Sequence, residues 1–218
     1  TEFYRADVRY DHSYRGGNIR TAVSLGYDQT RLNEQRNAQT KSVGIRTQLE
    51  QELGSGTRVR AGFDTVMDAY TADKATYADP EDPGTVRFNN LFPPRQDIAL
   101  GTWGDLVLNL TPEIEVTPGL RVDVYGSGGT SAVGVDPRIA ARFSVSDKVR
   151  IIHAYGIAHQ PPAFVVPIPG LTPGNLEGGL QTSFQTSAGV EVDVADATTA
   201  SATLFQNAFF DMSDALGT

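Results

Sequence analysis

The sequence predicts an all-β fold: an antiparallel transmembrane β-barrel, of which about ten strands lie in this chain. The first observation is an alternation of polarity that begins at residues 2–14, where Tyr and Val in one parity oppose Arg and Asp in the other. Because successive side chains of a strand point to opposite faces, such a segment has one apolar and one charged wall. The second observation is that short, turn-forming sequences between these segments alternate with longer connections.

Ten segments carry this alternation, so each is expected to turn its apolar residues to lipid and its charged residues to the barrel lumen. Leu108 is expected to face lipid near the middle of the membrane. The predicted strands lie near 2–14, 19–30, 41–53, 57–70, 96–110, 114–126, 137–146, 149–159, 182–195 and 199–212. The candidate lumen-facing residues are Arg5, Asp7, Arg9, Arg46, Arg60, Asp64, Arg121, Asp123, Arg138 and Arg142.

The connections predict how the strands are oriented. Short Gly-, Asn- and Asp-containing links suit tight hairpin turns, and the longer links are expected at 31–40, 71–95, 127–136 and 160–181. Outer-membrane barrels place short turns in the periplasm and long loops outside. On that rule both chain ends lie on the extracellular side, which suggests a segment of a larger barrel of about 22 strands. Residues 1–218 are thus interpreted as one barrel segment without a plug domain.

Composition excludes several other classes. A net charge of −8 and a pI near 4.8 argue against a nucleic-acid partner, which favours a basic surface. The absence of Cys excludes disulfide scaffolds and thiolate metal sites. No run of about 18 apolar residues is present, so no transmembrane helix is expected.

Short stretches in the second half of the chain carry a family resemblance. They are Asp97–Asp105, Pro118–Tyr125, Asp136–Phe143, Ala154–Pro162 and Thr203–Asn207 with Asp211-Met212. In order and spacing they resemble strands of the barrel of TonB-dependent outer-membrane receptors. The resemblance implies a bacterial outer-membrane receptor that takes up a scarce ligand such as a siderophore, glycan, vitamin or peptide. It also implies contact with outer-membrane lipid, and a plug domain and TonB as partners outside this segment. Neither a plug nor a C-terminal strand with an aromatic end is found in the sequence.

Ligand recognition is expected at the external connections, because selectivity of a rigid barrel resides where loops overhang its mouth. The candidate ligand-contacting residues are Tyr77, Arg87, Phe88, Phe92 and Phe164. No cofactor and no metal site is expected. His153 and His159 lack a nearby carboxylate to complete a ligand set, and the acidic stretch 79–82 lacks the spacing of a known calcium loop.

Two alternatives of other classes stay open. A plug-less relative would serve as a passive outer-membrane pore or as a structural component of an envelope complex. An outer-membrane hydrolase is less favoured, because it needs a Ser/His or Asp/His set at the barrel rim. The alternation places His12 and His159 about a membrane thickness apart, and no catalytic motif is found, so we do not expect an enzyme.

Overall fold

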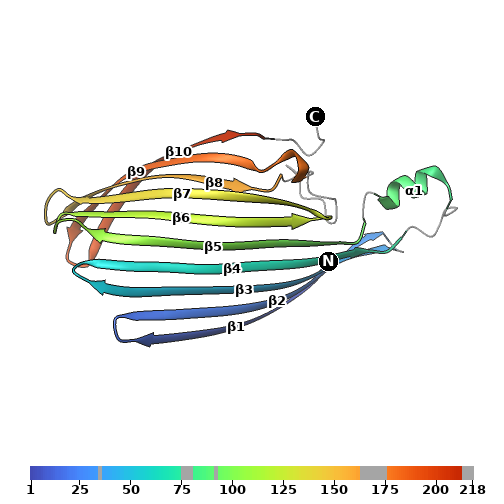
Figure 1. Cartoon of the computed structure of the whole chain (residues 1–218), viewed down its shortest axis with the longest axis horizontal. Helices are drawn as coiled ribbons and strands as arrows, with labels where there is room; N and C mark the ends of the chain where they lie inside the picture. The colour runs from blue at the N-terminus through green and yellow to red at the C-terminus, as the bar shows by residue number, and fades with distance from the viewer. Residues whose placement is uncertain (34–35, 75–80, 91–92, 163–175, 213–218) are drawn as a thin grey trace.

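The computed structural model describes residues 1–33, 36–74, 81–90, 93–162 and 176–212. They form one antiparallel sheet in which strands pair in chain order from β1 to β10 (Figure 1). The strands are β1 (Glu2–Tyr14), β2 (Gly17–Asn33), β3 (Arg36–Gly54), β4 (Thr57–Ala72), β5 (Arg95–Asn109), β6 (Ile114–Ser127), β7 (Thr130–Ser144), β8 (Val149–Gln160), β9 (Gln181–Ala195) and β10 (Thr198–Phe210). The predicted all-β class and the ten antiparallel strands are confirmed. Within the described residues, no helix is long and apolar enough to cross a membrane.

The two ends of the sheet differ in their connections. At one end, here called the turn end, five short links join β1 to β2, β3 to β4, β5 to β6, β7 to β8 and β9 to β10. At the other, the loop end, the β4–β5 connection contains helix α1 (Pro83–Asn90), and the β8–β9 connection contains the 3₁₀ helix η1 (Leu176–Gly178). Figure 1 shows the N-terminus at the loop end, and β10 runs toward the same end.

Two of the four predicted long connections are wrong. The region 31–40 is mostly strand, because β2 runs to Asn33 and β3 starts at Arg36. The alternation of polarity could not predict this extension, because the residues there are polar on both faces although their backbones still pair. The region 127–136 contains only a tight turn, in which Gly128 and Gly129 have φ of +59° and +87°. Two left-handed residues make the hairpin turn that matches strand twist, so β7 begins at Thr130.

Pairing register separates the two faces of the sheet through every strand. One row runs Val8, Val23, Ile45, Thr65, Leu100, Val124 and Val133 across β1 to β7. The next row on the opposite face runs Arg9, Ala22, Arg46, Asp64, Gly101, Asp123 and Gly134. We call these the apolar face and the charged face. Many apolar side chains of the apolar face are exposed, with Val8 at 72% and Tyr10 at 60%, and a large exposed apolar surface marks a site of contact with lipid or protein.

Leu108 lies at the turn end and not near the middle of its strand, because β5 ends at Asn109. The expectation of Leu108 near the middle is therefore wrong: the predicted strand 96–110 already ended two residues after Leu108, and β5 ends one residue after it. Leu100 lies closer to the middle of β5 on the same face, opposite Thr65 and Val124.

Candidate functional site on the charged face

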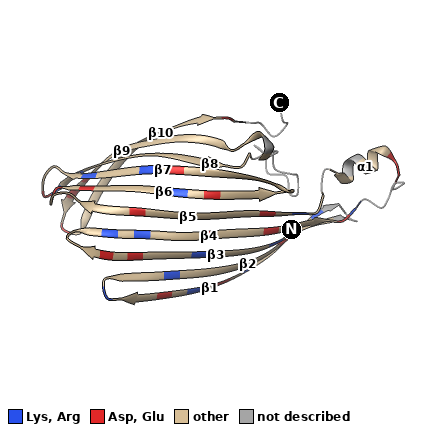
Figure 2. Ribbon diagram, in the orientation of Figure 1, with Lys and Arg blue, Asp and Glu red and all other residues tan. Residues whose placement is uncertain are grey.

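All ten charged residues that the alternation singled out lie on the charged face, and eight of them form ion pairs with oppositely charged neighbours. Figure 2 shows basic and acidic residues interspersed along the same strands. Arg121 of β6 forms the most extensive contacts. Its guanidinium donates to both carboxylate oxygens of Asp123 at 2.6 Å and to both of Asp64 at 2.9 Å. Asp64 lies on β4, so this cluster spans three strands.

A second ion-pair cluster joins β7 to β5, one strand further along the sheet. Arg138 of β7 donates to Asp105 of β5 from Nε at 2.9 Å and from Nη2 at 2.7 Å. Arg60 of β4 lies 3.7 Å from the same carboxylate. The Arg138 guanidinium also lies over the Trp103 ring, 5.4 Å from its centroid, in cation–π geometry. Asp105 was not singled out as a site residue, although its parity with Trp103 places it on this face.

The other predicted residues of this face lie outside these two clusters. Arg5 pairs with Asp28 at 2.7 Å and Arg9 with Asp11 at 2.7 Å, both between exposed side chains. Arg142 lies 3.6 Å from Glu191 of β9. The remaining two, Asp7 and Arg46, line one shallow hollow together with Asp64. Exposed pairs of this kind contribute about 0–1 kcal/mol each, so they shape the surface more than they hold it together.

A third cluster, which the sequence reasoning missed, lies at the turn end of β8 and β9. Arg150 donates to both carboxylate oxygens of Asp193, at 2.9 and 2.7 Å, and to Glu191 at 3.2 Å. Thr199 donates its hydroxyl to Asp193 at 2.7 Å. The predicted strand ranges contained these residues, but only the register shows that Arg150 and Glu191 face each other.

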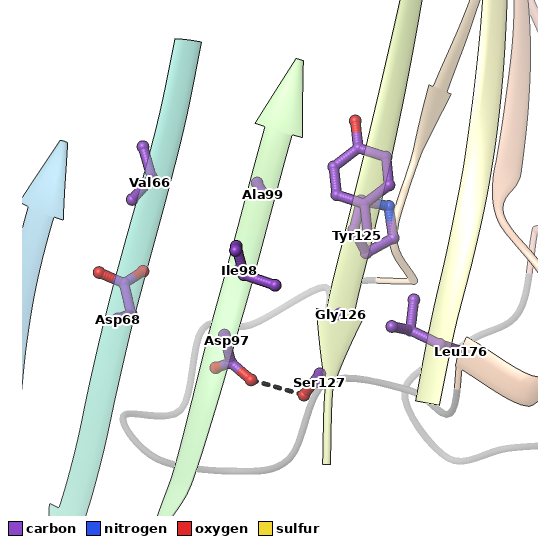
Figure 3. A pocket seen from close by; sticks show the side chains of 10 residues that line it. Val66, Asp68, Asp97, Ile98, Ala99, Tyr125, Gly126, Ser127 and Leu176 are labelled. Carbon is purple, nitrogen blue, oxygen red and sulfur yellow. Dashed lines mark hydrogen bonds between the residues drawn. The ribbon is translucent and has the colours of Figure 1, made fainter. Parts of the chain in front are cut away.

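At the loop end, the charged face carries a small pocket of about 180 Å³ (Figure 3). Asp68 and Asp97 face each other on β4 and β5, and Asp97 accepts hydrogen bonds from Ser127 at 2.5 Å and Arg95 at 2.8 Å. The aromatic ring of Tyr125 and the buried Leu176 of η1 close the other side. A mixed polar and aromatic hollow of this kind can hold part of a small polar ligand.

Three hydrogen bonds hold the base of the β8–β9 connection to this pocket. His159 Nδ1 lies 2.5 Å from Asp136 Oδ1, and the Tyr125 hydroxyl donates to the His159 carbonyl at 3.3 Å. Gln160 donates to Gln181 at 2.9 Å, across the two strand ends that the connection joins. Leu176 of η1 lines the same pocket, so part of the long connection forms the pocket wall.

The predicted ligand-contacting residues are only partly placed. Arg87 and Phe88 lie in α1, which begins after Asp82, whose carboxylate accepts a hydrogen bond from the Thr85 N–H at 2.9 Å. That bond is a helix N-cap, a structural role for one member of the acidic 79–82 stretch. The other candidates, Tyr77, Phe92 and Phe164, lie outside the described residues.

No group of three or more His, Cys, Asp or Glu side chains with the geometry to hold a metal ion is found within the described ranges. The two candidate histidines lie in different surroundings. The His153 ring packs on Tyr155 with centroids 4.4 Å apart, whereas His159 contacts Asp136.

A single antiparallel sheet, with strands in chain order, one apolar face and one charged face, is the arrangement found in the walls of up-and-down β-barrels. The chain belongs to the family of TonB-dependent receptor-like β-barrels, which it matches over residues 2–218. The comparison with curated proteins gives no match.

Solved structures of similar fold are transporters and receptors. The FrpB iron transporter from Neisseria meningitidis (F3-3 variant) aligns with a TM-score of 0.70 at 11% identity, over 94% of this chain and 35% of that chain. The siderophore receptor PirA from Pseudomonas aeruginosa gives 0.69 at 16% identity, over 95% and 39%. The copper transporter OprC gives 0.64 at 14% identity, over 95% and 38%. The chain therefore spans little more than a third of each of these chains.

Proposed function

We propose that this chain forms part of the wall and mouth of an outer-membrane receptor that takes up a scarce ligand by TonB-dependent transport. The observation that carries the proposal is the family match, which covers nearly the whole chain, together with a sheet whose two faces differ throughout in polarity. The apolar face would contact lipid and the charged face would line the lumen.

In this assignment the loop end is extracellular, because it carries both long connections. The pocket with Tyr125, Asp97 and Leu176 then opens at the mouth of the barrel, where an incoming ligand first meets the wall. The structural neighbours are named as iron, copper and siderophore proteins, so a metal or a metal chelate is the first ligand class to test.

The experiment is ligand uptake by cells that produce the full-length receptor with residues 81–90 deleted. We expect ligand binding and uptake to fall strongly, while the folded barrel keeps its heat-modifiable mobility on gels. A folded deletion protein with unchanged uptake would remove α1 and its flanks from the binding surface. Uptake that persists after deletion of TonB would favour the passive pore over the active receptor.

A further inference from the structure

The small pocket at the loop end of the charged face has a single short side chain as its floor. Register places Ala99 of β5 between Val66 of β4 and Tyr125 of β6, so the alanine leaves a hollow between two larger side chains (Figure 3). The next row toward the loop end is Asp68, Asp97 and Ser127. The pocket volume of about 180 Å³ is below the range of about 300–1,000 Å³ usual for whole ligands, so it suits one end group of a larger molecule.

The charge of this pocket is set by Asp68. Asp97, which faces it across the strand pair, accepts a hydrogen bond from Arg95 at 2.8 Å, and the nearby Arg5 pairs with Asp28 at 2.7 Å. For the Asp68 carboxylate itself, no hydrogen bond or ion pair is found within the described residues. Three carboxylates here share two arginines, so the negative charge of Asp68 is left unbalanced.

One lysine lies nearby, but on the other face of the sheet. Lys41 of β3 pairs with Ala69, in the parity of the apolar face, and it lines a neighbouring hollow that Asp68 and Asp97 also border. Lys41 is exposed, and in the described part of the chain no ion pair joins it to either carboxylate. The Asp68 carboxylate is therefore available to a cation from another molecule.

An unbalanced carboxylate and an aromatic ring that line one small hollow are together suited to an organic cation. The carboxylate accepts charge-assisted hydrogen bonds from N–H donors, and the ring attracts a cation placed over its face. An anionic group would be repelled by Asp68 and Asp97.

We propose that the pocket is a subsite for a cationic end of the ligand, an ammonium or a guanidinium, held between the Asp68 carboxylate and the Tyr125 ring. Val66 and Leu176 would contact the hydrocarbon next to the charged group. The place of this subsite at the mouth of a receptor rests on the proposed function. Among metal chelates, the subsite favours those whose organic part carries an amine over those with anionic groups alone.

The test measures binding of para-trifluoromethyl-benzylammonium to the full-length receptor in neutral detergent by fluorine NMR, with the corresponding benzyl alcohol as the uncharged probe. The alcohol is expected to bind about tenfold more weakly, because it cannot form the charge-assisted hydrogen bond. Asp68→Asn should weaken binding of the ammonium about tenfold and leave the alcohol unchanged. The matched control is Asp196→Asn, which removes the same charge from the exposed β9–β10 turn and should change neither.

Two further variants separate the ring of Tyr125 from its hydroxyl. Tyr125→Phe loses the hydrogen bond to the His159 carbonyl but keeps the ring, so it is expected to bind the ammonium as the unchanged receptor does. Tyr125→Leu loses both and is expected to bind about threefold more weakly. Equal binding by these two variants would overturn the placement of the cation against the ring.

Equal binding of the two probes by the unchanged receptor, or binding of neither, would overturn the proposal. Unchanged binding of the ammonium by the Asp68→Asn protein would do the same. The proposed function is tested separately, by whether uptake through the receptor needs TonB. Uptake without TonB refutes the function and leaves the cation subsite standing, whereas TonB-dependent uptake by a receptor without preference for the cation refutes only the subsite.

Discussion

Gly101 lies directly beneath the Arg121 guanidinium, and a Cβ atom at that glycine would come within 2.1 Å of Arg121 Nη2. The same Cβ would lie 2.4 Å from Asp123 Oδ1. Gly119 has the equivalent place under the second cluster, since its Cβ would meet Asp105 Oδ1 at 2.1 Å and Arg138 Nε at 3.0 Å. In both clusters the strand between the partners has a glycine at the crossing point, and this glycine leaves space for arginine to reach a carboxylate two strands away.

Replacing Gly101 with Ala should therefore displace the Arg121 ion pairs and lower the free energy of unfolding by about 1–3 kcal/mol. The measurement is the urea dependence of heat-modifiable mobility for the full-length receptor in lipid vesicles. Gly104→Ala on the same strand is the control, because its nearest atom, the Arg60 carbonyl oxygen, is 3.9 Å away. Equal stability of the two variants would show that the cluster accommodates a methyl group without loss.

A lysine on the apolar face should be costly in proportion to its depth in the membrane. Leu100→Lys, near the middle of β5, is expected to cost about 2–4 kcal/mol, and Leu108→Lys, one residue from the end of β5, about 0–1 kcal/mol. Folding of the two variants into lipid vesicles measures the difference. If Leu108→Lys proved the more costly, the turn end would lie deeper in the bilayer than we propose.

Asp82 is expected to stabilise α1 as its N-cap, through the 2.9 Å bond from the Thr85 N–H. Asp82→Ala should weaken the helix by about 1 kcal/mol and speed amide exchange at residues 84–90, whereas Asp82→Ser keeps a capping oxygen. Hydrogen–deuterium exchange with mass spectrometry checks this. Identical exchange in the alanine and serine variants would mean that Pro83 and tertiary contacts, not the cap, hold the helix.

The orientation of the sheet can be read from cysteine labelling of intact cells, since this chain contains no cysteine. A membrane-impermeant maleimide should label Glu81→Cys, in the β4–β5 connection at the loop end. It should not label Asp147→Cys, in the β7–β8 turn, until the outer membrane is permeabilised. The reverse pattern would place the turn end outside and would remove the basis for the mouth pocket.

The strands could be predicted from the sequence because a two-residue period survives wherever one face is apolar. The hairpin at Gly128-Gly129 could not, because glycines on both sides interrupt the period and Asp136-Pro137 reads as a strand start. The strand extensions near Asn33 and Arg36 were missed for the related reason that both their faces are polar.

The sequence predicts on which face of the sheet each site residue lies, but it does not predict which of these residues are in contact. Parity places Arg121 and Asp64 on the same wall, but whether they touch depends on the register of three strands and on Gly101 between them. His159 shows the limit of parity more sharply. Pairing of β7 with β8 stops at Arg138 and Gly156, next to Pro137, which has no N–H to donate. Beyond that point the end of β8 no longer pairs with β7 but stays close to it: a Cβ atom at Gly134 would lie 2.8 Å from His159 Cβ, and His159 contacts Asp136 of the charged face.

Because the strands pair in chain order, the number of residues in each tight turn determines which side chains of the next strand face each side of the sheet. Every strand takes its position from the strand before it, so one residue inserted at Gly128-Gly129 would exchange the inward and outward side chains of β7. Arg138 would then enter lipid, and Ile139 would replace it above Asp105. The strands after β7 would then also have their inward and outward side chains exchanged, unless a β-bulge restored the original register. A length change of one residue in a two-residue turn is therefore expected to be far more damaging than a change of its sequence.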